Sequence, residues 1–202
     1  MKSFRYIAIE GCIGVGKTTL AEKLAGFRRS HLSVENFEKN PFLEEFYSDP
    51  QNNVLENSLQ FLLIHCLQNK QMVKIKKEEI IADFSHHKDP IFAEVNLINK
   101  SEKNLFVEAC QLLHAKLSTP DLVVFIRGDD SFIYSRILQR NRKMEMMTPL
   151  AYYAKINAAY ERYFSNYNGP LLVIDVKSYD VFKSDDDLKR ISEAIDMACS
   201  KL

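Results

Sequence analysis

A glycine-rich segment near the start of the chain ends in a lysine and two threonines. The run Gly11-Cys12-Ile13-Gly14-Val15-Gly16-Lys17-Thr18-Thr19 fits G-x-x-x-x-G-K-[ST], directly after an apolar run and directly before a segment of helical period. In such a loop the backbone N–H groups surround phosphate oxygens, the lysine reaches the β- and γ-phosphates, and the next hydroxyl binds Mg²⁺. A simple connecting turn has no need of Lys17 and Thr18. The segment therefore predicts a nucleoside triphosphate site, in which we expect Cys12 to be a small filler and not a reactive thiol.

Two acidic residues and three arginines fall where a kinase needs a base, a metal ligand and a lid. Glu35 and Asp83 end the second and third expected strands, and so belong at the carboxyl edge of the sheet, where ligands of open α/β folds bind. Glu35 is a candidate base for an acceptor hydroxyl, and Asp83 a candidate Mg²⁺ ligand. Arg136, Arg140 and Arg142 could close on phosphate. Each acid alone also fits a cap or a surface charge, and the arginines also fit a helix C-terminus, where cations are favoured.

The elements that must position these residues alternate between short apolar runs and longer segments of helical period. Strands are expected at Tyr6–Glu10, Leu32–Val34, Ile80–Asp83, Leu122–Ile126 and Leu171–Asp175. Helices are expected at Lys17–Phe27, Pro41–Tyr47, Val54–Lys74, Ile91–Asn96, Lys103–Leu117, Ser131–Gln139, Leu150–Tyr163 and Asp185–Ala198. This order predicts an α/β fold, a five-stranded parallel sheet flanked by helices. Two polar segments without clear period, Phe84–Pro90 and Arg140–Thr148, are candidate functional loops.

Composition narrows the class of protein. The 202 residues contain no linker rich in Pro, Gly or Ser, so residues 1–202 are expected to form one domain. Lys plus Arg and Asp plus Glu both number 27, which gives no net charge to attract nucleic acid or an anionic membrane. The apolar runs are too short to span a bilayer. Four cysteines lie far apart without a Cys-x-x-Cys pair, which predicts a reducing, cytoplasmic location and neither a zinc site nor disulfides.

Within the phosphate-loop proteins, the later sequence separates switches from kinases. A GTPase switch should show Asn-Lys-x-Asp, but Asn69-Lys70-Gln71-Met72 and Asn99-Lys100-Ser101-Glu102 both lack the aspartate. The chain instead resembles the deoxyribonucleoside kinases, above all the small bacterial deoxyadenosine and deoxyguanosine type. The resemblance rests on the residues from Tyr6 through the phosphate loop, Glu35, Asn40-Pro41-Phe42-Leu43, Phe46-Tyr47-Ser48-Asp49-Pro50, Asp83, Ile91-Phe92-Ala93, Pro120-Asp121-Leu122-Val123-Val124-Phe125, the arginines with Glu145, and Leu172-Val173-Ile174-Asp175.

The resemblance implies a role for each matching residue. Glu35 would take the proton of the nucleoside 5′-hydroxyl as it attacks the γ-phosphoryl group of ATP, and Asp83 would help to hold Mg²⁺. Tyr47 and Glu145 would bind the sugar 3′-hydroxyl, and Phe92 would pack on the acceptor base. Arg136 would lie near the donor base and Arg140 and Arg142 on its phosphates, while Asp180 and Phe182 belong to the loop beside the donor adenine. A homodimer is also implied, and the stripe Leu59, Leu62, Leu63, Cys66 and Leu67 is either core or the dimer face.

The chain departs from the family pattern in its long helix and after its third strand. By the register set at Tyr47, the glutamine that usually contacts the acceptor base is Ser58, and the arginine seven residues later is His65. Both matched positions point into the pocket, so we expect readout of the base to differ from the usual scheme. A histidine on a helix is, however, more often paired within the fold than a ligand, and this interpretation of His65 stays open. The arginine that often follows the acid at Asp83 is replaced by Phe84.

These observations favour one function and leave two others open. The leading interpretation is a Mg-ATP-dependent kinase that phosphorylates the 5′-hydroxyl of a deoxyribonucleoside, a purine one by resemblance, in nucleotide salvage. A thymidylate-type monophosphate kinase shares the loop and lid, but needs an arginine where Phe84 stands. The third interpretation, which Ser58 and His65 motivate, is a degenerate nucleotide-binding regulatory subunit without turnover.

Overall fold

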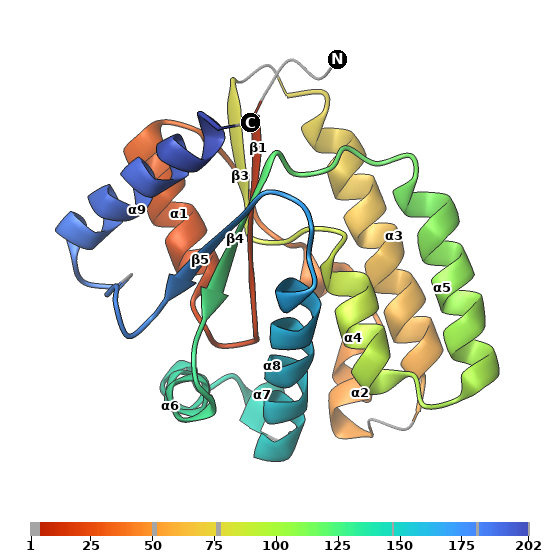
Figure 1. Ribbon diagram of the computed structural model, residues 1–202. Helices are drawn as coiled ribbons and strands as arrows, with labels where there is room; N and C mark the ends of the chain where they lie inside the picture. Colours follow the sequence, from red (N-terminus) through yellow and green to blue (C-terminus); the bar gives the residue numbers. More distant parts are fainter. Residues whose placement is uncertain (1–4, 50–51, 76–77, 147, 181, 202) are drawn as a thin grey trace.

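The protein is built around one parallel sheet (Figure 1). The computed structural model describes residues 5–49, 52–75, 78–146, 148–180 and 182–201. The strands are β1 (Arg5–Gly11), β2 (His31–Ser33), β3 (Glu79–Ala82), β4 (Leu122–Arg127) and β5 (Leu171–Asp175), in the spatial order β2-β3-β1-β4-β5. All four neighbouring pairs are parallel. The α/β fold with a five-stranded parallel sheet, predicted from the sequence, is confirmed.

Helices cover both faces of the sheet, as parallel strands require. In Figure 1, α1 and α9 lie on one face, while α3, α4 and α8 lie on the other with α5 packed outside α3. The helices are α1 (Lys17–Arg28), α2 (Leu43–Ser48), α3 (Val54–Met72), α4 (Lys88–Asn96), α5 (Lys100–His114), α6 (Asp130–Arg140), α7 (Lys143–Met146), α8 (Leu150–Ser165) and α9 (Asp185–Cys199), with a short 3-10 helix η1 at Phe37–Lys39. Loops between β1 and α1, between β4 and α6, and around α7 gather at the carboxyl edge of the strands, at the bottom of Figure 1.

The central strands are buried on both faces, which explains why they read as unbroken apolar runs. Ile9 of β1 and Val124 of β4 are fully buried beside Leu20 of α1. On the other face the ring of Phe125 stacks on Tyr160 of α8, with ring centroids 6.4 Å apart. This tightly packed core makes the sheet a rigid support for the loops at its carboxyl edge.

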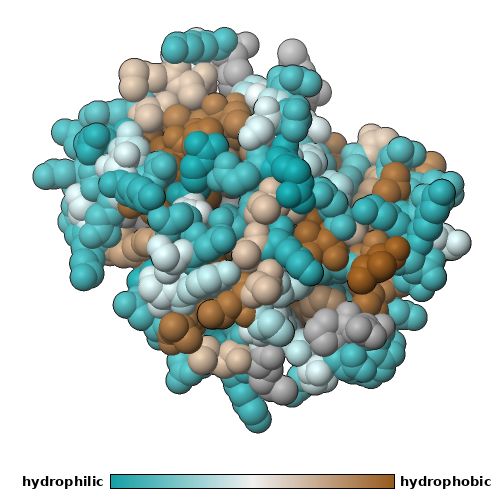
Figure 2. All heavy atoms as spheres, turned by 60° about the horizontal axis from the view of Figure 1, so that its bottom comes forward, coloured by the Kyte–Doolittle hydropathy of each residue, from teal (hydrophilic) through white to brown (hydrophobic). Residues whose placement is uncertain are grey.

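The carboxyl edge opens onto a mixed surface. Figure 2 turns this end of the molecule toward the reader and shows that hydrophilic side chains cover most of it, with separate hydrophobic patches between them. In the described ranges no helix is long and apolar enough to cross a membrane.

Some boundaries differ from the predicted ones for local reasons. Helix α4 begins at Lys88, three residues before the expected Ile91, because Pro90 falls in the first turn, where its missing N–H needs no partner. Helix α5 begins at Lys100 because the Asn99 side chain caps it, accepting from the N–H of Ser101 at 2.9 Å. The segment predicted to be a loop at 140–148 contains the four-residue helix α7.

The apolar stripe of α3 divides between the core and the surface. Leu62 and Cys66 are buried in a cluster that α4 and α5 complete. Leu63 and Leu67 are 48% and 60% exposed. The first pair therefore belongs to the core, with Leu59 partly buried against it, and the second pair is exposed and available to a dimer face.

Candidate active site

The phosphate loop adopts a shape that only glycine accommodates easily. Gly14 and Gly16 have φ of +84° and +109°, in the left-handed region that disfavours other residues. A Cβ at Gly16 would also lie 2.6 Å from the ring of Phe182. Lys17 follows at the start of α1, and its ammonium donates to the carbonyls of Gly11 and Cys12 at 2.8 and 2.9 Å. The helix N-terminus and this cation therefore face the same loop interior.

Cys12 behaves as the small buried filler that we expected. Its side chain is 1% exposed and its thiol lies 3.7 Å from the carbonyl oxygen of Tyr153. Burial raises the pKa of the Cys12 thiol to about 12, so that it stays protonated at neutral pH.

Asp83 joins the phosphate loop to the second strand. It lies directly after β3 and is 4% exposed. One carboxylate oxygen, Oδ2, accepts from the Thr18 hydroxyl at 2.6 Å, and the other, Oδ1, accepts from the backbone N–H of Glu35 at 2.8 Å. Two oxygen ligands suited to a hard cation therefore converge beside the loop.

The backbone of Glu35 is held on both sides by one side chain of α3. Gln68 donates to the carbonyl of Val34 at 2.8 Å and accepts from the N–H of Asn36 at 3.0 Å. Together with the bond from Glu35 N–H to Asp83, these contacts hold the segment between β2 and η1. Glu35 therefore starts from an anchored backbone, although it lies in no helix or strand.

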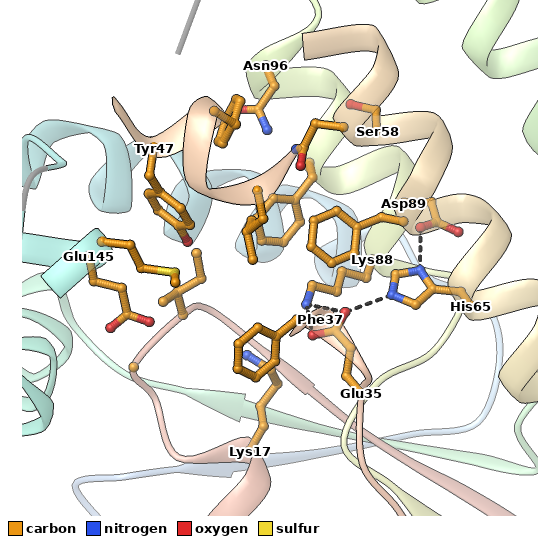
Figure 3. Close-up of a pocket in the computed structure, with 18 of the residues that line it drawn as sticks. Lys17, Glu35, Phe37, Tyr47, Ser58, His65, Lys88, Asp89, Asn96 and Glu145 are labelled. Carbon is orange, nitrogen blue, oxygen red and sulfur yellow. Dashed lines mark hydrogen bonds and ion pairs between the residues drawn. The ribbon is translucent and has the colours of Figure 1, made fainter. Parts of the chain in front are cut away.

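Two cations grip the carboxylate of Glu35. Lys88 Nζ lies 2.7 Å from Oε1 and 2.6 Å from Oε2, and His65 Nε2 lies 2.7 Å from Oε1 (Figure 3). Burial by itself raises the pKa of Glu35, but the charges of Lys88 and His65 outweigh it and hold that pKa well below its ordinary value. Glu35 is therefore an ionised carboxylate aimed into the cavity.

One cavity brings together most of the residues selected from the sequence. Figure 3 shows Tyr47 and Glu145 at one end and His65 with Asp89 at the other, while Lys17 and Glu35 lie below. The predicted residues along its wall are Ile13, Gly14, Lys17, Thr18, Glu35, Tyr47, Ser58, His65, Asp83, Phe92, Arg140, Arg142 and Glu145. Aromatic rings form part of the cavity wall. The ammonium of Lys88 lies 5.3 Å from the ring centroid of one of them, Phe92.

The lid arginines are paired with the acid of their own segment. Arg140 ends α6 and donates through Nε to Glu145 at 3.1 Å, with a second contact from its terminal nitrogen. Arg142 lies 3.7 Å from the same carboxylate. Glu145 is 4% exposed, whereas the two arginine side chains are 35% and 43% exposed. The arginines thus lie over the cavity mouth with Glu145 beneath them.

A second cluster lies outside the cavity, on the far side of the phosphate loop. The guanidinium of Arg136 lies 3.7 Å from the ring centroid of Phe182, and this ring also closes on Gly16. Asp180 accepts from the N–H of Phe182 at 3.0 Å and so shapes the turn. Three residues expected near the donor base therefore lie together, while Val181, between two of them, falls outside the described residues.

Ser58 and His65, the two positions of α3 that depart from the family pattern, both make contacts within the protein. The hydroxyl of Ser58 donates to the carbonyl of Val54 on its own helix at 2.7 Å, a common arrangement for a helical serine. His65 lines the cavity, and both of its ring nitrogens contact carboxylates. Beside them, Asn57 and Asn96 also line the cavity.

Sequence reasoning missed Lys88, Asp89 and Gln68. Lys88 left a partial signal, because it is a cation in the first turn of a helix, where the dipole disfavours it. The sequence does not report the burial of Asp89, at 1% side-chain exposure, or the contacts of Gln68 on both sides of Glu35.

A family model described as deoxynucleoside kinase matches residues 7–200. The chain belongs to the deoxynucleoside kinase family. It is 28% identical over 197 residues to the deoxyadenosine/deoxycytidine kinase of Bacillus subtilis (strain 168), covering 94% of this chain and 90% of that protein. It is 29% identical over 204 residues to the deoxyguanosine kinase of the same organism, covering 95% and 96%.

Solved structures agree with this membership. The deoxyadenosine kinase from M. mycoides, with the products dCMP and a flexible dCDP bound, superposes with a TM-score of 0.84 at 26% identity, covering 95% of this chain and 99% of that one. The same enzyme with bound dATP gives a TM-score of 0.84 at 25% identity over the same shares. This chain is accordingly a kinase that phosphorylates deoxynucleosides, and the thymidylate-type interpretation is not favoured.

A buried carboxyl group near the site predicts a stability that depends on pH. Glu10 in β1 is fully buried, accepts from Ser85 at 2.7 Å and from Tyr160 at 3.3 Å, and burial raises its pKa from 4.5 to about 7. Between these values the folded chain holds a proton that the unfolded chain has released, so this group makes the free energy of unfolding fall as pH rises through the window.

We expect Glu10→Gln to remove this contribution, which amounts to up to about 3 kcal/mol. Urea unfolding at pH 4.5 and pH 8 measures it. The loss of stability between these two pH values should be smaller in the variant than in the wild type, and an equal loss in both would contradict the assignment.

Proposed function

We propose that this kinase transfers the γ-phosphoryl group of ATP to the 5′-hydroxyl of a purine deoxyribonucleoside, with Glu35 as the base that receives the hydroxyl proton. One observation supports this most: the carboxylate of Glu35 and the ammonium of Lys17 line a single cavity together with Tyr47 and Glu145. Anionic phosphates fit the loop end, and a sugar fits between Glu35 and Tyr47. Nucleotide salvage is the corresponding cellular role.

The parts of the reaction divide among residues that are already in place. Lys17, Arg140 and Arg142 would neutralise charge on the phosphoryl group as it moves, because such transfers depend mostly on positioning and charge. Tyr47 and Glu145 would hold the sugar 3′-hydroxyl. Arg136 with Asp180 and Phe182 would hold the donor base outside the cavity.

Mg²⁺ fits the donor set beside the loop. Thr18 Oγ1 and Asp83 Oδ2 lie 2.6 Å apart, and both are hard oxygen ligands. In nucleotide sites Mg²⁺ takes only one or two protein ligands and fills its octahedron with phosphates and water. Thr18 and Asp83 would hold the ion there, and its charge would stabilise the triphosphate.

The acceptor base would lie against Phe92 and near Ser58. The side-chain amides of Asn57 in α3 and Asn96 in α4 would also lie near it. The carboxamide oxygen of Asn57 accepts from Asn40 at 3.0 Å, so toward a base Asn57 offers N–H donors. In Figure 3, Asn96 lies at the top of the cavity, away from Lys17. Relatives named for deoxyadenosine and for deoxyguanosine support a purine, whereas one relative also acts on deoxycytidine.

A panel of acceptors tests this function. We expect ATP with deoxyadenosine or deoxyguanosine to give higher kcat/KM than deoxycytidine or thymidine, and no phosphorylation of deoxynucleoside monophosphates, measured by ADP release. A preference for a pyrimidine would overturn the purine assignment. ATP binding without ADP release from any nucleoside would favour the regulatory-subunit interpretation.

Removal of one hydroxyl tests the sugar site. We expect Tyr47→Phe to raise KM for the deoxynucleoside by about tenfold, since a lost hydrogen bond to the 3′-hydroxyl costs roughly 1–1.5 kcal/mol. The same change should leave KM for a 2′,3′-dideoxynucleoside nearly unaltered. An equal rise for both acceptors would show that Tyr47 acts on something other than the 3′-hydroxyl.

Two further assignments complete the proposal. All four cysteines are free thiols, which supports a reducing, cytoplasmic location. The exposed pair Leu63 and Leu67 supports a homodimer through α3, which sedimentation of the wild type and of Leu67→Lys would test.

A further inference from the structure

His65 is the residue that departs most clearly from the family pattern, and its contacts give it a different task. Its side chain is 2% exposed and stands between two carboxylates. Nε2 lies 2.7 Å from Glu35 Oε1, and Nδ1 lies 2.6 Å from Asp89 Oδ1. Ionised carboxylates only accept hydrogen bonds, so both ring nitrogens carry a proton and the ring is an imidazolium.

Asp89 is held in turn from a third helix. His114, the last residue of α5, donates through Nε2 to Asp89 Oδ2 at 2.9 Å. The order Glu35, His65, Asp89, His114 therefore forms a chain of hydrogen bonds that runs from the cavity to the outer helix. Figure 3 shows its first three members in line.

The two oxygens of the Glu35 carboxylate are not equivalent in this chain. Oε1 receives both His65 and Lys88, whereas Oε2 receives Lys88 alone. The contact with His65 is thus what distinguishes Oε1 from Oε2. Because Gln68 and Asp83 hold the backbone of the same residue, the side chain has little freedom left.

We propose that His65, supported by Asp89 and His114, is a positioning residue that holds Oε1 of Glu35 and leaves Oε2 to receive the proton of the acceptor hydroxyl. This rests on the function proposed above. In that step the hydroxyl O–H bond breaks and its proton goes to Oε2. The hydroxyl oxygen forms a bond to the γ-phosphorus, and the bond from that phosphorus to the oxygen of the leaving ADP breaks. His65 already carries two protons, so it does not take up this proton.

A purely structural role explains the chain less well. Apolar residues of similar volume stabilise a core as well as a buried ion pair does, or better. Here four charged groups, Lys88, Glu35, His65 and Asp89, alternate in sign within one wall of the substrate cavity, and their charges sum to zero. The chain from His114 through Asp89 and His65 ends at the carboxylate of Glu35, which Lys88 also contacts.

A double-mutant cycle tests the proposal. We expect His65→Gln to lower kcat on the order of 100-fold while KM for the deoxynucleoside changes by less than about threefold, because a misplaced base affects the step and not binding. In the Glu35→Gln background the same change should alter single-turnover rate by less than about twofold, since His65 acts through Glu35. An equal factor in both backgrounds would overturn the proposal, as would a wild-type kcat for His65→Gln.

Matched variants separate this outcome from other failures. His31→Gln makes the same change at the amino end of β2, outside the lining of the cavity, and should keep wild-type kcat. If Glu35→Gln itself keeps kcat, the base assignment fails; if Glu35→Gln is inactive and His65→Gln is not, only the positioning role fails.

A measurement without turnover checks the ring directly. Nitrogen-15 NMR of the wild type at pH 7.5 should show both His65 ring nitrogens protonated, because the neighbours raise the pKa of His65 to about 9 despite burial, which lowers it. Asp89→Asn should reduce this protonation and lower kcat together. A neutral His65 ring in the wild type would overturn the proposal.

Discussion

Lys17→Ala is expected to lower kcat by about 1,000-fold or more, because the charge of Lys17 would stabilise the phosphoryl group during transfer. Lys17 is the first residue of α1, and its ammonium donates hydrogen bonds to two carbonyls of the loop. These bonds place the ammonium where β- and γ-phosphate oxygens would lie. Burial lowers the pKa of Lys17, and the nearby charge of Lys88 adds to this, so binding an anion would also strengthen its charged form.

Steady-state ADP release with saturating deoxyadenosine measures the effect. Lys17→Met keeps most of the side-chain volume, and so separates loss of charge from loss of packing. Lys189→Ala, at an exposed position of α9, is the control for removal of a lysine and should keep wild-type kcat. A Lys17→Ala enzyme within tenfold of wild type would mean that the loop binds phosphate without needing this cation.

Glu35→Gln is expected to retain ATP binding and to lower kcat by roughly 100- to 10,000-fold, the range for removal of a general base. The amide cannot take the hydroxyl proton. It also leaves the cations Lys88 and His65 facing each other without the carboxylate between them, so the variant should be less stable than the wild type.

Fluorescence titration with an ATP analogue and single-turnover rates separate the two effects. Adding Lys88→Met to Glu35→Gln removes one of the unpaired cations and should restore part of the thermal stability but none of the rate. Glu38→Gln, three residues later and exposed in η1, is the matched control. Near wild-type kcat in Glu35→Gln would remove Glu35 as the base.

The sheet was predictable because burial on both faces leaves a strong local signal. All five strands were predicted to within one residue. The signal is strongest in β1, β3 and β4, which are mostly buried apolar runs, and weaker in β2 and β5, which lie at the two edges of the sheet and are less buried. The phosphate loop was predictable for a similar reason, because its whole pattern is contiguous. Helix boundaries were less certain where a cap decides them, as at Asn99, or where proline falls inside the first turn, as at Pro90.

The site residues that could be predicted are those whose place in the sequence, such as the end of a strand, shows where they lie in the fold. Glu35 and Asp83 were found because they follow strands, and strand ends meet at one edge. The partners of Glu35 were not predicted, because Lys88 contacts it from α4 and Gln68 from α3. No local sequence pattern indicates contacts between such distant residues. His65 was assigned to the substrate by register, but register does not reveal that Asp89 turns the ring toward an acid.

Asp83 has one further consequence for how the two halves of the reaction communicate. Its oxygens have different partners: Oδ2 accepts from the hydroxyl of Thr18 in the phosphate loop, and Oδ1 accepts from the amide of Glu35. Because one carboxylate makes both contacts, a displacement of Asp83 at the phosphate loop would also displace the backbone that carries Glu35.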